Sequence, residues 1–498
     1  MKLEKSANRC EKSGMERQYT KTQDKWKYMS LLQKSIFFLI FLISFIFSIF
    51  FIPGNQQGNA NTVSRMAAVF AILQDGSLKI DRFASLTTDK ALVDGHAYSD
   101  KAPGQILTAL LPAGAALSVL RLAEIPTAPL RGEQYTVAYM VALWVSIFST
   151  SALFTALAAA SLAYLAKLLG ASSTAALFCA LGYALCTPAL GWASVMFSHG
   201  MAAGALCIAF ASLQASQRAL FSATRLWWHG VTAGAAIGLA IITEFTVAIP
   251  ALLIGLLAMP RGRPWPVVIG MVVGGLPFAV ALGAWNYIAF GAVTQIGYAA
   301  VVGFDGMRQG VFGISWPRPG VGWALIFSPY RGIVWFAPWL VFLPIAAYRA
   351  WQAWPRAAVV TCVVVITSSL CLNAGYSYWD GGWSTGPRHL MASLPFACLL
   401  FAPLWDAASA PMRWLLALTA SLGAALAIAC ASVDMAAPSD YRMPLFEYIL
   451  PRFLKGDVHN ALTLLGGQGH LTLLALPVIL FLPVAALWAA MGKAVRKA

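Results

Sequence analysis

The sequence predicts an all-α polytopic membrane protein with about 12 transmembrane helices, within a range of roughly 11 to 13. Of its 498 residues, 59% are apolar and only 11% are charged, whereas soluble domains have about 45–50% apolar and about 25% charged residues. Apolar runs near or above the roughly 18 residues that cross a bilayer recur along most of the chain. These observations exclude a soluble globular protein and favour a single membrane domain over residues 35–491.

Each predicted span is an apolar run that ends at proline, glycine or charge. The first follows a basic tail and precedes no Ala-x-Ala cleavage site, so we interpret it as a retained span and not a signal peptide. The run 106–120 contains Pro112 and is flanked by Lys101 and Arg121, which suits a helix lying in the membrane interface at least as well as a span. The predicted spans are 35–52, 136–165, 173–190, 193–213, 228–243, 245–260, 265–290, 332–348, 357–372, 389–405, 412–432 and 471–491.

The charge distribution predicts the orientation. The net charge is +15, and nine of the 34 lysines and arginines lie in residues 1–34. The positive-inside rule therefore places tails 1–34 and 492–498 in the cytoplasm. If the run 106–120 stays outside, the short basic loops also fall inside, so the surplus charge reports topology and does not indicate a nucleic-acid partner. The segments then predicted outside are 53–135, with interfacial helices, the turn near 191, 291–331, 373–388 and 433–470.

The first outer loop is the densest group of polar residues. Five of the chain's 19 carboxylates lie between Asn61 and Gly104, interleaved with lysine and arginine. Its first part, from Arg65 to Leu73, has apolar residues at helical spacing, which predicts an amphipathic helix on the membrane. A carboxylate in this loop could deprotonate a hydroxyl, and a basic residue could hold a departing phosphate. The alternative is a solvated loop whose charges pair locally.

Several motifs resemble those of C-type (GT-C) membrane glycosyltransferases, which include protein O-mannosyltransferases and lipid A aminoarabinose transferases. The first are Arg65-Met-Ala-Ala with Gly76, and Tyr98-Ser-Asp-Lys-Ala-Pro-Gly104. Further motifs lie between residues 286 and 388. They are Asn286-Tyr-Ile-Ala-Phe-Gly291 with Gly297-Tyr298, Ser328-Pro-Tyr-Arg-Gly332, and Trp379-Asp-Gly-Gly-Trp-Ser-Thr-Gly-Pro-Arg388.

The resemblance implies roles for residues of the first loop. Arg65 and Lys101 match family residues that hold the phosphate of a lipid carrier, and Asp100 matches a neighbouring carboxylate that is a candidate ligand for a divalent cation. The family's acidic pair before the arginine is replaced by Thr62 and Val63, which puts the role of that pair in doubt. We choose Asp81 as the best replacement for its carboxylate, with Asp89 next. Asp81 or Asp100 is the predicted base for the acceptor hydroxyl. Lys90 is a further candidate for the phosphate.

The later loops supply candidate substrate contacts. Trp379 and Trp383 flank Asp380 and could line a sugar or polyprenyl site, although aromatic residues also gather at membrane interfaces for purely structural reasons. Asp380 and Arg388 stand at a span boundary, where ionisable groups are costly unless paired or functional. Tyr298, from the motif Gly297-Tyr298, is a further candidate substrate contact.

Three further ionisable residues have open interpretations. Arg331 begins a span from the outer side, where a phosphate ligand or snorkelling to the interface would each explain its charge. His199 is a substrate contact or a satisfied intramembrane histidine. Glu244 divides two short apolar halves and is solvated if the turn of that hairpin lies outside.

Together these features predict a glycosyltransferase in the bacterial inner membrane that uses a polyprenyl-phosphate-linked sugar. The acceptor would be an extracytoplasmic lipid, glycan or protein. The alternatives are a transporter or lipid flippase, and a non-catalytic scaffold of an envelope-polymer assembly. The sequence contains no Walker A, His-Glu-x-x-His, Cys-x-x-Cys or Gly-x-Ser-x-Gly motif. It therefore shows no motif for ATP-driven transport or thiol chemistry.

Overall fold

The computed structural model describes residues 31–54, 58–217 and 221–495. Most of these residues are helical, and the predicted all-α class is confirmed. The predicted tail 1–34 lies outside the described residues as far as residue 30, and residues 496–498 of the predicted tail 492–498 also lie outside them.

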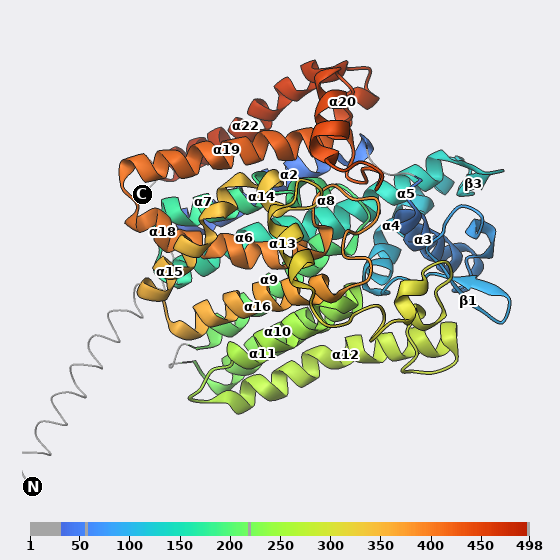
Figure 1. Ribbon diagram of the computed structural model, residues 1–498, viewed down its shortest axis with the longest axis horizontal. Helices are drawn as coiled ribbons and strands as arrows, with labels where there is room; N and C mark the ends of the chain where they lie inside the picture. The colour runs from blue at the N-terminus through green and yellow to red at the C-terminus, as the bar shows by residue number, and fades with distance from the viewer. Residues whose placement is uncertain (1–30, 55–57, 218–220, 496–498) are drawn as a thin grey trace, which may run out of the picture.

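Helices of very different lengths follow one another along the chain (Figure 1). The first half contains α2 (Leu31–Phe50), α3 (Ala60–Phe70), α4 (Gly104–Leu122), α5 (Val137–Ile147), α6 (Leu153–Leu168), α7 (Ser173–Leu185), α8 (Ala189–Trp192), α9 (Ser198–Ser216) and α10 (Ala223–Thr243). The second half contains α11 (Ala248–Leu257), α12 (Pro264–Phe290), α13 (Pro319–Phe327), α14 (Ile333–Phe336), α15 (Leu343–Ala353), α16 (Arg356–Gly375), α17 (Leu394–Leu399), α18 (Phe401–Ala407), α19 (Ala410–Val433), α20 (Leu450–Leu454), α21 (Ala461–Leu464) and α22 (Ala475–Val495).

Seven helices of the described chain are long and apolar enough to cross a membrane, and four shorter apolar helices accompany them. The seven include α4, α10, α12, α16 and α19. Helix α9 is less apolar but is buried along almost its whole length. A helix that faces only other helices needs no lipid-compatible surface, so α9 can carry the polar Ser198 and His199 at its first turn.

The predicted span 332–348 is wrong as a continuous helix. Residues 332–348 form α14, the short 3₁₀ helix Pro338–Phe342, and the start of α15. Proline has no N–H to donate and disfavours helical geometry in the preceding residue. Ala337, before Pro338, accordingly has φ −144° and ψ 74°. The break at Pro338 therefore divides the predicted span.

Helices α2 and α6 run antiparallel. The Phe37 ring contacts that of Tyr164 at 6.1 Å between centroids, and the Phe45 ring contacts that of Phe148 at 4.7 Å. Segment 51–136 consequently starts and ends at the same end of the bundle, where α3, α4, β1 and β3 also lie (Figure 1). We call this the site end. Helix α4 packs against α3 and α5 there, although its length and composition alone would allow it to be a span.

Glycines bring α10 and α12 into close contact, and this pairing fixes where α10 ends. A Cβ added to Gly234 would lie 2.0 Å from the Met271 carbonyl oxygen, and one added to Gly274 would lie 2.1 Å from the Val231 carbonyl oxygen. Small residues permit such backbone approach between membrane helices. Helix α10 ends at Thr243, so the next residue, Glu244, is delivered to the site end.

Short strands and long loops cover the site end. Two antiparallel hairpins lie there, β1 (Ala91–Val93) with β2 (His96–Tyr98) and β3 (Leu130–Arg131) with β4 (Gln134–Tyr135). Loop 297–318 joins this region to loop 376–388. The Val302 N–H donates to the Lys90 carbonyl at 3.2 Å, and the Ser377 N–H donates to the Gly313 carbonyl at 2.7 Å. Segments far apart in sequence are therefore tied together around one cavity.

Candidate active site

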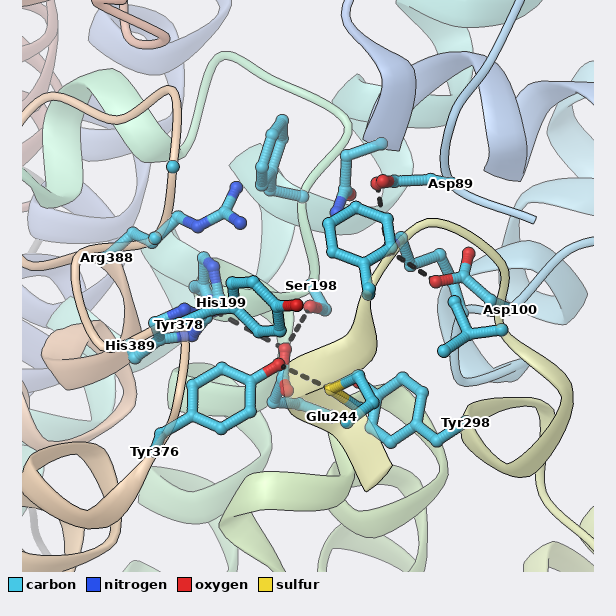
Figure 2. Close-up of a pocket in the computed structure, with 18 of the residues that line it drawn as sticks. Asp89, Asp100, Ser198, His199, Glu244, Tyr298, Tyr376, Tyr378, Arg388 and His389 are labelled. Carbon is cyan, nitrogen blue, oxygen red and sulfur yellow. Dashed lines mark hydrogen bonds and ion pairs between the residues drawn. The ribbon is translucent and has the colours of Figure 1, made fainter. Parts of the chain in front are cut away.

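A cavity of about 130 Å³ lies at the site end, among side chains from six separate segments. Figure 2 shows Asp89 and Asp100 on one side and Arg388 and His389 on the other. The residues lining it are Asn61, Arg65, Asp89, Asp100, Lys101, Phe197, Ser198, His199, Glu244, Tyr298, Val301, Phe304, Met307, Tyr376, Tyr378, Gly381, Gly382, Arg388 and His389.

Two carboxylates share one lysine on the first-loop side. Lys101 Nζ lies 2.8 Å from Asp89 Oδ2 and 2.9 Å from Asp100 Oδ2. The other oxygen of Asp100, Oδ1, accepts a long hydrogen bond of 3.4 Å from the Ser64 hydroxyl on α3. All three ionisable side chains are largely buried. Asp89 Oδ1 has no hydrogen-bond partner among the described residues and is available to a ligand.

Burial and the lysine charge shift these two carboxyl groups in opposite directions. Burial raises the pKa of Asp100, and the neighbouring Lys101 only partly offsets that effect. Burial also acts to raise the pKa of Asp89, but the charge and hydrogen bond of Lys101 outweigh it, so the pKa of Asp89 is lowered. Asp89 is thus held as the carboxylate, and Asp100 takes up a proton more readily. Such a separation is typical of acid and base pairs in active sites.

This group of residues does not fit the divalent cation that the resemblance implies. The Lys101 ammonium already contacts both carboxylates, where a cation would have to bind. Across the described ranges, no three His, Cys, Asp or Glu side chains are grouped so as to hold a metal ion. The positive charge between Asp89 and Asp100 comes from the chain itself.

Arg65 connects the first loop to α9 and to the end of α10. Its Nη1 donates to Asn61, and its Nη2 donates to the Ser198 hydroxyl at 3.2 Å. Ser198 in turn donates to Glu244 Oε2 at 2.5 Å. His199 Nδ1 lies 3.5 Å from the same Glu244 oxygen. Arg65 Nε is buried without a partner.

Glu244 is buried and not solvated, which corrects the interpretation open to the sequence. Its residue is 8% exposed. One oxygen accepts from Ser198 and the other accepts from the Thr246 hydroxyl at 2.9 Å. The turn after α10 is thus buried beneath the loops of the site end.

Arg388 presents unpaired positive charge to the cavity. No described carboxylate lies within 4 Å of its guanidinium, which sits over the Phe197 ring at 5.1 Å. Its Nε, and both ring nitrogens of His389, are buried without hydrogen-bond partners. Buried polar groups in native proteins are nearly always satisfied. These groups therefore indicate a polar ligand or water at this side of the cavity.

Aromatic side chains form the remaining wall. The Tyr378 hydroxyl accepts from the Gly306 N–H at 3.0 Å, and its ring contacts Phe304 at 5.4 Å between centroids. The Tyr376 ring meets His389 at 5.4 Å. Burial raises the pKa of Tyr298 well above its ordinary value, so this phenol stays protonated. Such a wall offers flat apolar faces together with hydroxyl groups.

The structure brings some predicted site residues into the cavity and leaves others outside. Those lining it are Arg65, Asp89, Asp100, Lys101, His199, Tyr298 and Arg388. Those outside its lining are Asp81, Lys90, Arg331, Trp379, Asp380 and Trp383.

Asp81, predicted as a base, does not line the cavity, whereas Asp89 and Asp100 do. Its Oδ2 lies 2.8 Å from His96 Nδ1, and its Oδ1 accepts from the Ala97 N–H at 2.7 Å. The side chain is about half exposed. Lys90 also points away from the cavity, because its ammonium donates to the Ala84 carbonyl. Both side chains hold the local fold of the first loop.

The motif from Trp379 to Arg388 lies mostly outside the cavity and packs against its wall. Trp383 is 57% exposed, and the Trp379 ring contacts Tyr330 at 6.1 Å. Asp380 accepts from the Tyr330 hydroxyl at 3.1 Å. Of this motif, Gly381, Gly382 and Arg388 line the cavity.

Several lining residues were not predicted. Ser198 and His389 are sequence neighbours of His199 and Arg388, and that adjacency was the only signal for them. Asn61 lies one helical turn before Arg65. The other unpredicted polar or aromatic lining residues are Phe197, Glu244, Phe304, Tyr376 and Tyr378.

No protein-family model and no curated protein matches this chain. Among solved structures, it is similar to ArnT from Cupriavidus metallidurans bound to undecaprenyl phosphate, with 16% identity, 92% of this chain and 75% of that chain covered, and a TM-score of 0.47. It is also similar to the oligosaccharyltransferase AglB from Archaeoglobus fulgidus in complex with an inhibitory peptide and a dolichol-phosphate, with 12% identity and a TM-score of 0.47. That match covers 80% of this chain and 56% of AglB.

Proposed function

We propose that the protein is a membrane glycosyltransferase that moves a sugar from a polyprenyl-phosphate carrier to an extracytoplasmic lipid, glycan or protein during envelope glycoconjugate synthesis. The observation that carries this proposal is one cavity with an ionised carboxylate, Asp89, facing an unpaired guanidinium, Arg388. Glycosyl transfer needs a base for the acceptor hydroxyl and a cation for the departing phosphate. The cavity offers one of each on opposite walls.

The proposed reaction is a single displacement. Asp89 Oδ1 takes the proton of the acceptor hydroxyl while that oxygen forms a bond to the anomeric carbon of the donor sugar. The bond from the anomeric carbon to the phosphate oxygen breaks, and polyprenyl phosphate leaves with the bonding electrons on that oxygen. Arg388 and Arg65 stabilise the developing negative charge. A single displacement inverts the configuration at the anomeric carbon, which the product would reveal.

Lys101 has a different role in this proposal from the phosphate contact that the resemblance implies. Its ammonium is shared by two carboxylates, so little of its charge is left for a phosphate. It keeps Asp89 ionised, since its charge outweighs the burial that would otherwise raise the pKa of that group. Lys101 thereby holds Asp89 in the ionised form that can accept a proton.

The orientation belongs to the same proposal. We place the site end outside the cytoplasm, because the basic loops of the sequence then fall inside. A site on that face cannot use nucleotide sugars made in the cytoplasm and must use a lipid-linked sugar that has crossed the membrane.

The test compares two aspartates of the same loop in the full-length protein, purified in detergent and assayed with a panel of polyprenyl-phosphate-linked sugars. We expect Asp89→Asn to lower kcat by about 10²- to 10⁴-fold, the contribution typical of general base catalysis. Asp81→Asn is the matched control, because Asp81 belongs to the same loop but lies outside the cavity. Wild-type rates from Asp89→Asn would overturn the proposal.

A second measurement separates the enzyme from the transporter alternative. Proteoliposomes loaded with the lipid-linked sugar are examined for a new glycosidic bond by mass spectrometry and for movement of the sugar lipid across the bilayer. The proposal expects a glycosidic product. Movement of the lipid without a product would favour a transporter or flippase.

A further inference from the structure

Arg331 is a fully buried arginine that lies outside the cavity and has no described carboxylate within 4 Å of its guanidinium. The sequence left it as a phosphate ligand or a snorkelling side chain. Its place outside the cavity does not favour the first role, and its burial does not favour the second. Arginine is rarely buried without a charged partner. Its contacts must therefore satisfy the guanidinium in another way.

Backbone carbonyl groups supply those contacts. Arg331 Nε donates to the Asp380 carbonyl at 2.7 Å, and Nη2 donates to the Gly382 carbonyl at 2.7 Å. Nη1 donates to the Tyr330 carbonyl at 3.2 Å, and the guanidinium lies over the Tyr330 ring at 3.9 Å. Two of these bonds span the turn 380–382. The planar fork of arginine can hold both carbonyls at once, which the single ammonium of lysine cannot do with the same geometry.

That turn lies against Arg388. Gly381 and Gly382 have φ of 75° and 59°, a conformation that side chains other than glycine rarely adopt. A Cβ added to Gly381 would lie 2.8 Å from Arg388 Nε and 3.1 Å from its Cγ. The backbone of the turn thus forms one support of the Arg388 side chain. The Phe197 ring, 5.1 Å from its guanidinium carbon, forms another.

We propose that Arg331 is a positioning residue: by holding turn 380–382 through two carbonyls, it sets the place of the Arg388 guanidinium that receives the donor phosphate. This inference rests on the proposed function of Arg388 and extends it to a residue that contacts no substrate. A buried charge bound to backbone carbonyls fixes the turn more firmly than an apolar side chain could, since removing it leaves those carbonyls unsatisfied.

The experiment measures the affinity of the full-length protein in detergent for undecaprenyl phosphate, used as a probe for the leaving group. Arg331→Lys keeps the charge but loses one of the two carbonyl contacts. Gly381→Ala displaces Arg388 from the other side without changing Arg331. A displacement of about 1 Å at a catalytic group can cost about 10²-fold, so we expect each variant to weaken binding by about 10- to 100-fold.

Double variants decide whether the effect passes through Arg388. In an Arg388→Ala background, we expect Arg331→Lys and Gly381→Ala to change affinity by less than about twofold, because residues acting through one group are not additive. Gly382→Ala is the matched control for backbone strain, since its added Cβ would meet no atom within 4 Å. We expect it to weaken binding less than Gly381→Ala does.

The outcomes separate this inference from the proposed function. If Arg331→Lys and Gly381→Ala weaken binding by the same factor with and without Arg388, the positioning role is overturned while the phosphate role of Arg388 stands. If Arg388→Ala itself binds undecaprenyl phosphate as the wild type does, the proposed function fails. Equal losses from Gly381→Ala and Gly382→Ala would also overturn the positioning role, because strain alone would then explain them.

Discussion

The two opposite walls of the cavity treat buried charge in contrasting ways. On the first-loop wall, Lys101 contacts Asp89 and Asp100 at 2.8 and 2.9 Å, so positive and negative groups compensate one another within the chain. On the other wall, Arg388 has no described carboxylate within 4 Å, and its Nε and both nitrogens of His389 lack hydrogen bonds. The charges of the first wall are balanced without a ligand, whereas those of the second are not.

The contrast indicates where specificity for an anion would reside. A buried ion pair contributes little to net stability but is costly to break. An unpaired buried cation costs stability in the free protein and is compensated when an anion binds. Changes to Lys101 or Asp100 should therefore act mainly on folding, and changes to Arg388 should act mainly on activity. Asp89, the proposed base, should affect both.

The largest effect that we expect is on the first wall. Lys101→Met leaves two carboxylates facing each other with no cation, so we expect a loss of about 3–5 kcal/mol in the free energy of unfolding. Thermal unfolding of the purified protein in detergent measures it. The double variant Lys101→Met with Asp100→Asn should recover part of the loss, because one of the two uncompensated charges is removed. An unfolding temperature unchanged by Lys101→Met would contradict the reading of this wall as self-compensated.

Loss of the Arg388 charge from the second wall should lower activity without lowering stability. We expect Arg388→Ala to lower kcat/KM by about 10²- to 10³-fold, or about 2.7–4 kcal/mol of transition-state stabilisation. It should leave the unfolding temperature equal to or above that of the wild type, because an unsatisfied buried group is removed. Transfer assays and thermal unfolding on the same sample check both parts.

Arg308 provides the control for Arg388. It is an exposed arginine in the neighbouring outer loop and does not line the cavity. Arg308→Ala should change kcat/KM by less than about twofold, as distant surface substitutions usually do. Equal losses from Arg308→Ala and Arg388→Ala would mean that general surface charge, and not a specific contact, is responsible.

Most of the fold could be predicted from the sequence because a lipid bilayer restricts which backbone structures can cross it. Apolar runs near bilayer length can only be helices in a membrane, and the helices found follow those runs closely. The failure at 332–348 has a local cause, since Pro338 interrupts a run whose composition alone suggests a span. The position of α4 could not be decided from composition, and the antiparallel contact of α2 with α6 was needed.

The site was accessible only in part, for a different reason. Asp89, Asp100 and Lys101 stand close together in the sequence, so their charges could be assigned to one region. Glu244 lines the same cavity only because α10 ends beside α9 and the loops of the site end fold over that end. The place of Asp81 outside the cavity lining could not be predicted, because a sequence shows that a carboxylate is present but not which way a hairpin turns it. The packing of the loops around the cavity decides where both side chains lie.

A smaller effect should distinguish the two carboxylates of the first wall. Burial raises the pKa of Asp100, so ionising it costs the folded state stability. That cost grows as pH rises from the ordinary carboxyl pKa of about 3.9 through the higher folded pKa, and then stays constant. Asp100→Asn removes the titrating group while its amide oxygen can still accept from Lys101. The unfolding temperature of the variant should therefore gain on that of the wild type as pH rises from 4 to 8.

An equal difference between wild type and Asp100→Asn at every pH would contradict this assignment. Asp89 should show the reverse dependence. Lys101 outweighs burial and lowers the pKa of Asp89, so Asp89 contributes stability above the ordinary carboxyl pKa that is lost as pH falls through its folded pKa. Asp89→Asn should therefore lose stability relative to the wild type as pH rises through that lower range.

The smallest effect should come from Asp81, which tests where the reactive part of the loop ends. The Asp81 side chain is about half exposed and pairs with His96, and exposed pairs of this kind contribute about 0.2–1 kcal/mol. Asp81→Asn keeps an oxygen that can accept from the Ala97 N–H and removes only the charge. We expect a transfer rate within about twofold of the wild type and a barely lowered unfolding temperature. A large loss of kcat with an unchanged unfolding temperature would show that the outer hairpin takes part in the reaction, and the cavity boundary would then have to be extended to include it.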